Sequence, residues 1–579
     1  MDLSRSLRLL RRQLRASEMW FIALAVMIGG AAGLLSVLQN DIADSLQAFL
    51  YQAPGAHIDA LPYVPPSSLI WLPIGGVILG MIAWQVQRSR TRPLIDVVEA
   101  NALYGGLLSL RDSAIVCVQT WLSNGFGGSV GLEAAYAQSG GAAASAIGQA
   151  LRVRRQDLRT LLGAGAGAAI GAAFGAPLTG AFYAFEIVIG SYAPSMIAPV
   201  AAACLASVLV ATSLGAAPYS LHVHVLQAPG AWDYVTFAGL GFISALVGIA
   251  VMRLAARVDS LVQKSGLPVW IRPFCGGVIL AVLGFVQPQT LSSGHGALTQ
   301  DLTGKLAIDV LTGIFLLKAC ASIVSLGFGF RGGLFFASLL LGALLGQIYV
   351  DALVSMGAPL AMQRDSAALV GMGSLGVAIV GGPLTMSFLV LESTRDFGVS
   401  AATLAASLIG STIVRERFGY SFSTWRLHLR GETIRSARDV GWMRKLTAGR
   451  MMRTSFSTIA AGATIAEFRR RFPLGSRTFV VAIDETQHYA GIALVADAWR
   501  EGRSEVELVG AIAGPATYTL SPQSDVDDVM RMFDQAEAEE LVVVDGAGSP
   551  IGTLSEVYVA RRYARELEEV HNSVFGERR

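Results

Sequence analysis

Charged side chains and cysteines are both scarce in this sequence of 579 residues. Asp, Glu, Lys and Arg make up only 15% of the chain, whereas 53% of its residues are hydrophobic. A soluble protein of this size does not usually bury so much apolar surface, so lipid is expected to cover part of it. The four cysteines stand alone within apolar sequence, which indicates neither a disulfide framework nor a metal site. They are Cys117, Cys204, Cys275 and Cys320.

The residue constellations of enzymes are also missing. The sequence has no Ser/His pair, no paired aspartates and no cluster of metal ligands in a catalytic arrangement. It therefore predicts no enzyme, no catalytic residue, no metal and no required cofactor. The net charge of +2 gives no indication of nucleic acid as a partner.

Long apolar runs are what the sequence has instead. Several are long enough to cross a hydrocarbon core of about 30 Å. They cover residues 19–38, 68–85, 195–215, 233–254, 271–286 and 306–325. Two further runs, 331–350 and 364–393, are studded with glycine, and the second contains Gly-Pro, which predicts short, tilted or broken helices lining a pathway. We expect a mainly α, polytopic protein embedded in a lipid bilayer.

Arginines mark the expected cytoplasmic side. The segment 1–18 carries five of them before the first apolar run, and no small-residue cleavage site follows that run. We interpret it as a retained cytoplasmic segment by the positive-inside rule, with both termini in the cytoplasm and a bacterial inner membrane as the expected location. The five are Arg5, Arg8, Arg11, Arg12 and Arg15.

The composition changes after about residue 426. We divide the chain into a membrane domain (19–430), a polar linker (431–445), two soluble repeats (446–508 and 509–568) and a tail (569–579). The two soluble repeats share residues at a constant offset of 61, which indicates two copies of one unit. Each copy predicts a short helix, a strand, a turn that begins with Asp and a second strand, so this domain is α+β. The matching pairs are Ile465/Val526, Phe468/Val529, Phe472/Phe533, Asp484/Asp545 and Gly491/Gly552.

The membrane half contains a second repeat. Six residues recur at an offset of 206: Gly175/Gly381, Pro177/Pro383, Leu178/Leu384, Thr179/Thr385, Phe182/Phe388 and Glu186/Glu392. Upstream, Gly125-Phe126-Gly127 with Gly131-Leu132 matches Gly327-Phe328-Gly329 with Gly333-Leu334 at an offset of 202. The next residue is Glu133 in one copy and Phe335 in the other, so the copies diverge where a site is expected. Repeats in transporters are commonly inverted, with the substrate at their interface near the bilayer midplane.

Glu133 is a carboxylate in a small-residue stretch of membrane sequence, SVGLEAAYAQSGG. An ionised carboxylate there is costly and is usually functional or paired. The preceding glycines free backbone amides, and the following helix offers its positive N-terminal end to an anion. An ionised Glu133 competes with an anion for that position, and a protonated one leaves it, which links proton binding to anion passage. The alternative is a Glu that only caps its own helix.

At these residues the sequence resembles the CLC family of chloride channels and proton-chloride exchangers. That family carries three anion-site motifs, GSGIP, G(K/R)EGP and GxFxP, at helix N-termini. GLEAA (131–135) resembles the second and GLFFA (333–337) the third, while RPLID (92–96) lies where the first is expected and lacks its serine. Either Arg92 or Pro93 takes the serine position. Proline there is associated in the family with nitrate preference, and the alternative reading is a proline at the first helical position.

The resemblance implies a homodimer with one anion pathway per subunit and Glu133 as the gate. It implies that the pathway is lined at Pro93, Leu94, Gly131, Leu132, Ala134, Ala135, Leu334, Phe335, Phe336 and Tyr420. Exchangers of this family carry an inner glutamate for protons one residue after the position of Glu186. Here that residue is Ile187, which weakens the case for proton coupling. The proton pathway is therefore assigned to Glu133 and Glu186, although the counterpart Glu392 favours a shared structural role.

The soluble repeats resemble a tandem pair of CBS domains. Members that hold adenine nucleotides often show Gly-x-x-Ser/Thr-x-x-Asp. The first copy has Asp497 but Leu494 at the hydroxyl position, and the second has Ser555 but Tyr558 at the acid position. A composite adenine-nucleotide site at Asp497 and Ser555 and a purely structural or dimerising role both remain open.

The function expected from these features is transport of chloride or a similar small anion, with protons as a coupled partner and antiport slightly favoured. The alternatives are a passive voltage- or pH-gated chloride channel and a CBS-regulated divalent-cation transporter. The last would need several carboxylates converging in the pore, whereas the pore-forming segments offer chiefly Glu133.

Overall fold

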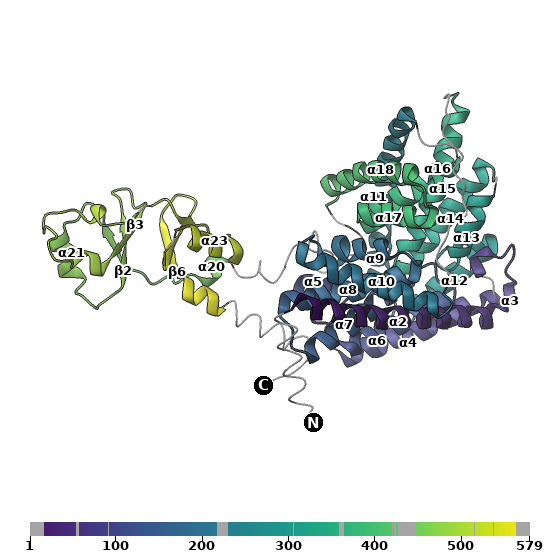
Figure 1. Cartoon of the computed structure of the whole chain (residues 1–579), viewed down its shortest axis with the longest axis horizontal. Helices are drawn as coiled ribbons and strands as arrows, with labels where there is room; N and C mark the ends of the chain where they lie inside the picture. Colours follow the sequence, from purple (N-terminus) through teal and green to yellow (C-terminus); the bar gives the residue numbers. More distant parts are fainter. Residues whose placement is uncertain are drawn as a thin grey trace. The chain divides into compact units, whose positions relative to one another are not determined.

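The chain divides into two compact units, 1–439 and 440–579, and each is described by itself (Figure 1). The computed structural model describes residues 17–53, 57–90, 92–216, 230–304, 306–357, 364–419, 421, 424–425, 447–514, 516–536 and 538–562. Nearly all of the predicted basic segment 1–18, together with the linker 431–445, the tail 569–579 and Tyr420, lies outside these residues.

Helices make up nearly all of the regular secondary structure in the described part of the first unit. Its helices are α2 (Glu18–Tyr51), η1 (Ile58–Ala60), α3 (Pro66–Leu69), α4 (Trp71–Ser89), α5 (Val97–Tyr104), α6 (Leu110–Gly125), α7 (Glu133–Ala150), α8 (Arg155–Phe174), α9 (Pro177–Tyr183), η2 (Ala184–Ile189), α10 (Pro194–Ser213), α11 (Ala231–Lys264), α12 (Arg272–Val286), η3 (Pro288–Thr290), α13 (His295–Thr303), α14 (Ile308–Gly327), α15 (Phe335–Ser355), α16 (Arg364–Val380), α17 (Pro383–Thr394) and α18 (Phe397–Arg417).

Seven helices in the described residues are long and apolar enough to cross a membrane. They span Glu18–Tyr51, Pro66–Ser89, Pro194–Ser213, Trp232–Lys264, Ile308–Gly327, Phe335–Ser355 and Phe397–Arg417. Large apolar side chains on α2, α10, α12 and α14 point outward. Met27, Leu209, Phe285 and Leu316, one from each of these helices, are 56–69% exposed. Water does not favour such a surface, and a hydrocarbon core does.

Two predicted runs turn out differently from each other. The run 364–393 is broken as expected, because α16 ends at Val380 and α17 begins at Pro383 after two glycines with positive φ. The run 331–350 was expected to form short, tilted or broken helices, and it is neither short nor broken. It becomes α15, an unbroken helix of 21 residues, because its internal glycines pack closely on α16 without interrupting the helix.

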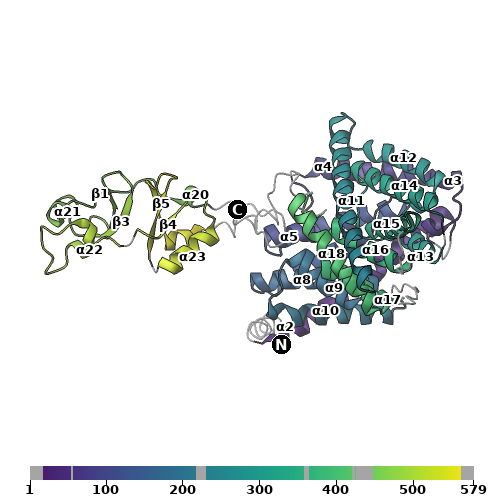
Figure 2. The same cartoon turned by 90° about the horizontal axis from the view of Figure 1, so that it is seen from above.

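The two membrane repeats fold alike. The successive helices α6, α7, α8 and α9 recur in the same order as α14, α15, α16 and α17. Helices α7 and α8 pack together in the first copy, as α15 and α16 do in the second, and α9 lies against α17. Figure 2 shows α8, α9 and α10 gathered in one part of the unit and α12, α14 and α15 in another.

The second unit contains two small sheets of the same topology. In each, the first strand pairs parallel to the second, and the second pairs antiparallel to the third. The elements are α20 (Ala448–Met451), β1 (Thr458–Ala460), α21 (Ile465–Arg471), β2 (Phe479–Ile483), β3 (Tyr489–Leu494), α22 (Val495–Ala498), η5 (Val509–Ala511), β4 (Thr519–Leu520), α23 (Val526–Ala536), β5 (Glu540–Val544) and β6 (Pro550–Ser555).

The predicted order of helix, strand, turn and strand is confirmed in both copies, and β1 and β4 are additional strands. Each turn is closed by its aspartate: Asp484 accepts from the backbone N–H groups of Thr486 and His488, and Asp545 accepts from those of Ala547 and Ser549. The hydroxyl of Thr486 and the amide of His488 lower the pKa of Asp484, since both favour the ionised carboxylate.

Packing in the second unit crosses the position 508/509 at which we divided the repeats. Val509 lies in the hydrophobic cluster of the first sheet, whereas Ala448 and Met451 lie in the cluster of the second. The segment around Arg453 pairs with Thr553 of the second sheet. The expected fold class is confirmed: a mainly α polytopic protein with two repeats and broken helices, followed by a smaller α+β unit.

Candidate functional site

Glu133 begins α7 directly after a tight glycine turn. Gly127 adopts a φ of +88°, which side chains rarely tolerate. Asn124 fixes the turn from within, because its Nδ2 donates to the carbonyl of Val130 at 2.9 Å. The chain therefore leaves α6 and enters α7 with the Glu133 side chain held inside the unit.

The glycine turns of the two membrane repeats bind each other. The N–H of Gly131 donates to the carbonyl of Gly333 at 3.0 Å, and the N–H of Gly333 donates to the carbonyl of Gly131 at 3.2 Å. This antiparallel bridge joins residues 202 positions apart, which are equivalent in the repeats. The N-termini of α7 and α15 are thereby brought together.

The Glu133 carboxylate lies between these two N-termini. The side chain is 4% exposed, and its Oε1 accepts from the N–H of Phe336, in the first turn of α15, at 3.1 Å. Its Oε2 is buried and has no hydrogen-bond partner. The carboxylate of one repeat thus occupies the helix N-terminus of the other, where the unpaired amides of a first turn and the helix dipole favour a negative charge.

Two glycines leave room for this carboxylate. A Cβ added to Gly131 would lie 2.0 Å from Glu133 Oε2, and a Cβ added to Gly333 would lie 3.0 Å from the same oxygen. Any side chain at Gly131 is therefore incompatible with the present position of the carboxylate.

The predicted anion-binding residues of the second and third motifs gather around Glu133. Leu132, Ala134 and Ala135 lie at the start of α7, and Leu334, Phe335 and Phe336 lie at the start of α15. Leu132, Ala135 and the three residues of α15 are buried.

Pro93 and Leu94 lie in irregular chain ahead of α5. That helix begins at Val97, where Asp96 caps it by accepting from the N–H of Glu99. The alternative reading of Pro93 as the first helical residue is therefore wrong, because a better capping residue lies three positions later. Gln138 of α7 donates to the carbonyl of Ile95 at 3.1 Å, so the segment is tied to the helix that carries Glu133.

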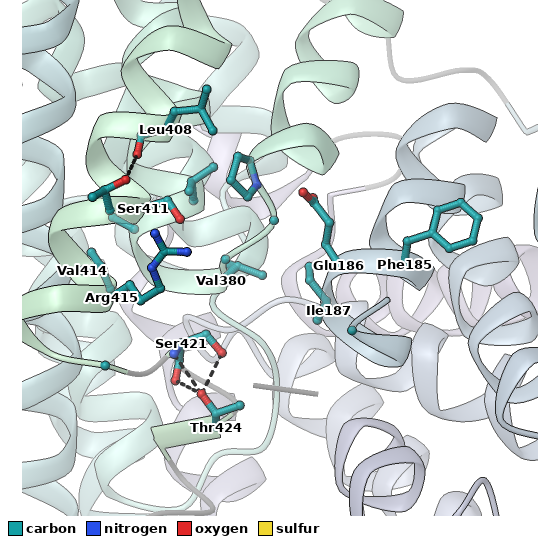
Figure 3. Close-up of a pocket in the computed structure, with 18 of the residues that line it drawn as sticks. Phe185, Glu186, Ile187, Val380, Leu408, Ser411, Val414, Arg415, Ser421 and Thr424 are labelled. Carbon is teal, nitrogen blue, oxygen red and sulfur yellow. Dashed lines mark hydrogen bonds between the residues drawn. The ribbon is translucent and has the colours of Figure 1, made fainter. Parts of the chain in front are cut away.

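A cavity of about 500 Å³ opens in the first unit near the end of α18. Glu186, Ile187, Val380 and Arg415 line it, together with Ser421 and Thr424, and Figure 3 shows Glu186 and Arg415 on opposite sides of it. Tyr420, the predicted pore tyrosine, lies outside the described residues.

Glu186 and Glu392 each accept hydrogen bonds from the start of a helix in the other repeat. Glu186 accepts from the N–H groups of Leu384 and Thr385 and from the Thr385 hydroxyl, all at the start of α17. Glu392 does the same for Leu178 and Thr179 at the start of α9. Each carboxylate accepts three hydrogen bonds from equivalent donors, with distances of 2.7–3.1 Å.

The candidate nucleotide residues belong to different sheets of the second unit. Asp497 lies on α22, after the first sheet, and Ser555 ends β6 of the second. The Ser555 hydroxyl accepts from the N–H of Tyr558 at 3.3 Å.

Sequence reasoning missed a polar cluster beside the gate. Lys318 is fully buried in α14, and its Nζ donates to the carbonyls of Leu291 and Ser292. Asp59 is buried as well, and His295 stacks on Phe336. Lys318 had a signal, because it is a charged residue in the middle of an apolar run, whereas the stacking of His295 had none. Within the described ranges, no group of three or more His, Cys, Asp or Glu side chains is arranged to hold a metal ion.

Residues 75–415, more than half of the chain, match the sequence family described as "Voltage gated chloride channel". The chain belongs to this family. It is 27% identical over 399 residues to the putative chloride channel protein ClcB-like of Ralstonia nicotianae, a match that covers 67% of this chain and 92% of the relative. It is 26% identical over 376 residues to the voltage-gated ClC-type chloride channel ClcB of Shigella boydii, covering 63% and 88%.

Solved structures agree with this voltage-gated chloride channel family in fold. A slow cyanobacterial Cl⁻/H⁺ antiporter superposes with a TM-score of 0.61 at 20% identity, over 71% of this chain and 97% of the antiporter. A CLC-type fluoride/proton antiporter gives 0.56 at 21% identity, over 68% and 95%. A eukaryotic CLC transporter gives 0.60 at 17% identity over 95% of this chain and 98% of its own. Together with the apolar helices, the family makes the chain an integral multi-pass membrane protein.

Proposed function

We propose that this protein carries chloride or a similar small anion across the membrane, with Glu133 as a protonatable gate. The observation that carries the proposal is the position of the Glu133 carboxylate. It occupies the paired N-termini of α7 and α15, accepting from Phe336 N–H, with one oxygen unpartnered. An anion would need the same amides, so an ionised Glu133 blocks it and a protonated Glu133 yields to it.

Backbone amides suit such a pathway because conduction needs sites that release as readily as they bind. The residues proposed to line it are those around Glu133 at the starts of α7 and α15, the segment Pro93–Leu94, and Tyr420. The first motif lacks its serine and has Pro93 at or beside that position, so nitrate is to be tested beside chloride.

Proton-coupled antiport is the favoured mode, and a passive channel is the alternative. Antiport is supported by the fold neighbours, two of which are antiporters by their titles. Ile187 stands against it, because an isoleucine cannot relay a proton, and Glu186 is engaged by three donors of α17. We propose that Glu186 chiefly joins the repeats and that water in the neighbouring cavity carries protons toward Glu133.

The second unit is proposed to be a tandem pair of CBS domains that modulates transport or stabilises a homodimer. Two consecutive sheets of identical topology support this assignment. An adenine nucleotide is the candidate ligand, at Asp497 and Ser555. The basic segment 1–18 and the second unit are proposed to lie on the cytoplasmic side of a bacterial inner membrane.

A CBS-regulated divalent-cation transporter is the less favoured function. Divalent cations prefer several oxygen ligands that include carboxylates. Around the paired N-termini of α7 and α15 the structure offers the Glu133 carboxylate together with amide N–H groups. The N–H groups carry partial positive charge and repel cations.

The test is anion efflux from liposomes with simultaneous recording of pH, for wild type and Glu133→Gln. Wild type is expected to release chloride and to move protons in the opposite direction. The substituted protein is expected to release chloride without proton movement, because glutamine cannot ionise. Proton coupling that survives Glu133→Gln contradicts the gate, and a proton gradient that fails to drive chloride uphill in wild type establishes the channel alternative.

A further inference from the structure

Four aromatic rings form a stacked column that ends beside the gate. His57 stacks on His295 at 5.9 Å between ring centroids, and His295 stacks on Phe336 at 3.4 Å. Phe174, at the end of α8, stacks on Phe336 at 5.7 Å between ring centroids, with the planes 3° apart. His57 is exposed, whereas Phe336 and Phe174 are buried. The column therefore runs from the surface to the amide that binds Glu133.

The segment that carries His295 is fixed by buried polar contacts. Lys318 Nζ donates to the carbonyls of Leu291 and Ser292 at 3.1 and 2.9 Å. Just after the histidine, the N–H of Gly296 donates to Asp59 Oδ1 at 3.3 Å. A Cβ on Gly296 would lie 2.7 Å from that oxygen, so the glycine is required for this approach. A buried lysine and a buried aspartate thus hold one short segment in register.

The ring of Phe336 is the bulky exception in the internal repeat. The equivalent residue of the first copy, 202 positions earlier, is Ala134. Phe336 is fully buried, and its N–H is the donor to Glu133 Oε1. Because the amide and the ring belong to one residue, restraining the ring restrains the donor.

We propose that His295 is a positioning residue for the Glu133 gate. By stacking on Phe336 it holds the first turn of α15 so that the Phe336 amide meets the ionised carboxylate. The inference rests on the proposed function, since it assigns to His295 an effect on that gate. The column, and not the charge of the histidine, does the positioning.

The ionisable groups near the column come from several elements. They are Asp44 on α2, which lies 3.9 Å from His57, His57 and Asp59 at η1, Asp301 on the same helix as His295, Lys318 on α14, and Glu133, which accepts from the Phe336 N–H. Ser293 Oγ lies 2.8 Å from His295 Nδ1 and orients the imidazole. Separating ring stacking from charge therefore needs variants that remove one without the other.

The experiment measures chloride efflux from liposomes as a function of pH. Removing the ring with His295→Ala loosens Phe336 and weakens the charge-assisted bond to Glu133, so the carboxylate leaves its position more readily. The pH midpoint of efflux is expected to rise by on the order of half a unit, with the maximal rate at acid pH unchanged. His295→Phe keeps a ring without a titratable nitrogen and is expected to retain the wild-type midpoint.

Three outcomes overturn the proposal: an unchanged midpoint in His295→Ala, a shift in His295→Phe as large as in His295→Ala, or a shift of the His295→Ala kind that persists when Glu133→Gln is also present. If His295→Ala does not give a monodisperse protein, His295→Leu fills the volume without a planar ring, and the same shift is expected. A failure of the proposed Glu133 gate can be told apart from a failure of the His295 proposal. If Glu133 is not the gate, Glu133→Gln alone leaves the pH dependence of efflux intact.

Discussion

At the scale of single residues, the absence of a side chain at Gly131 matters as much as the carboxylate of Glu133. The Glu133 Oε2 occupies the space that a Cβ on Gly131 would fill. Gly131 has an ordinary negative φ and forms the bridge to Gly333 through its backbone, so neither of these features requires glycine. The requirement for glycine comes from the seated carboxylate.

Gly131→Ala is therefore expected to unseat the gate. With a Cβ 2.0 Å from its oxygen, the carboxylate must move out, and chloride efflux at neutral pH should rise toward that of Glu133→Gln. The close contact also costs stability, by about 1–3 kcal/mol for an overpacked position. Efflux and the apparent melting temperature in detergent measure the two effects.

Gly333→Ala is the matched control, since its Cβ would lie 3.0 Å from the same oxygen. A contact at that distance is relieved by a small shift, so the rise in efflux should be smaller. Equal effects of the two substitutions, or a wild-type pH dependence in Gly131→Ala, would show that the carboxylate does not need this space.

At the scale of elements, the two repeats are joined by reciprocal contacts. Glu186 of the first copy binds the start of α17, and Glu392 of the second binds the start of α9. Phe182 and Phe388 are also equivalent residues, and their rings stack on each other with the centroids 4.5 Å apart. Each carboxylate satisfies first-turn amides that a helix cannot satisfy itself, which is the general role of a cap.

Glu186→Gln and Glu392→Gln should lower stability by similar amounts. Each replaces a carboxylate that accepts three hydrogen bonds with an amide that has one acceptor oxygen, at a cost of about 1–3 kcal/mol. The apparent melting temperature in detergent should fall equally in both, and proton coupling should survive in both. Loss of proton movement in Glu186→Gln alone would instead assign Glu186 to the proton pathway.

The internal offsets of 206 and 202 predicted this arrangement of elements because glycine and proline act locally. Gly381-Gly382-Pro383 breaks a helix wherever it occurs, and the equivalent Gly175 and Pro177 do the same. The start of α5 at Val97 was missed because two local signals competed, Pro93 and the capping Asp96. The bond from Glu133 to Phe336 joins residues 203 apart, and spacing alone does not predict which amide meets a carboxylate.

At the scale of the whole molecule, each unit has its own hydrophobic clusters. Glu133, Phe336 and His295, the described residues that form and position the gate, belong to the first unit. In the second unit one cluster contains Val480 and another contains Leu541, so both sheets bury apolar side chains within that unit. Units with separate cores are able to fold and act separately.

Removal of residues 440–579 is therefore expected to leave anion efflux and its pH dependence in place. Adding Glu133→Gln to the truncated chain should abolish proton movement as it does in the full chain, because the gate is built within the first unit.

Adenine nucleotide added on the side of the second unit should alter efflux in the full chain alone, and Asp497→Ala with Ser555→Ala should remove that response. A truncated chain that elutes as a stable species but carries no anion would show that the second unit is part of the transport machinery, and a nucleotide response that survives truncation would move the ligand site into the first unit.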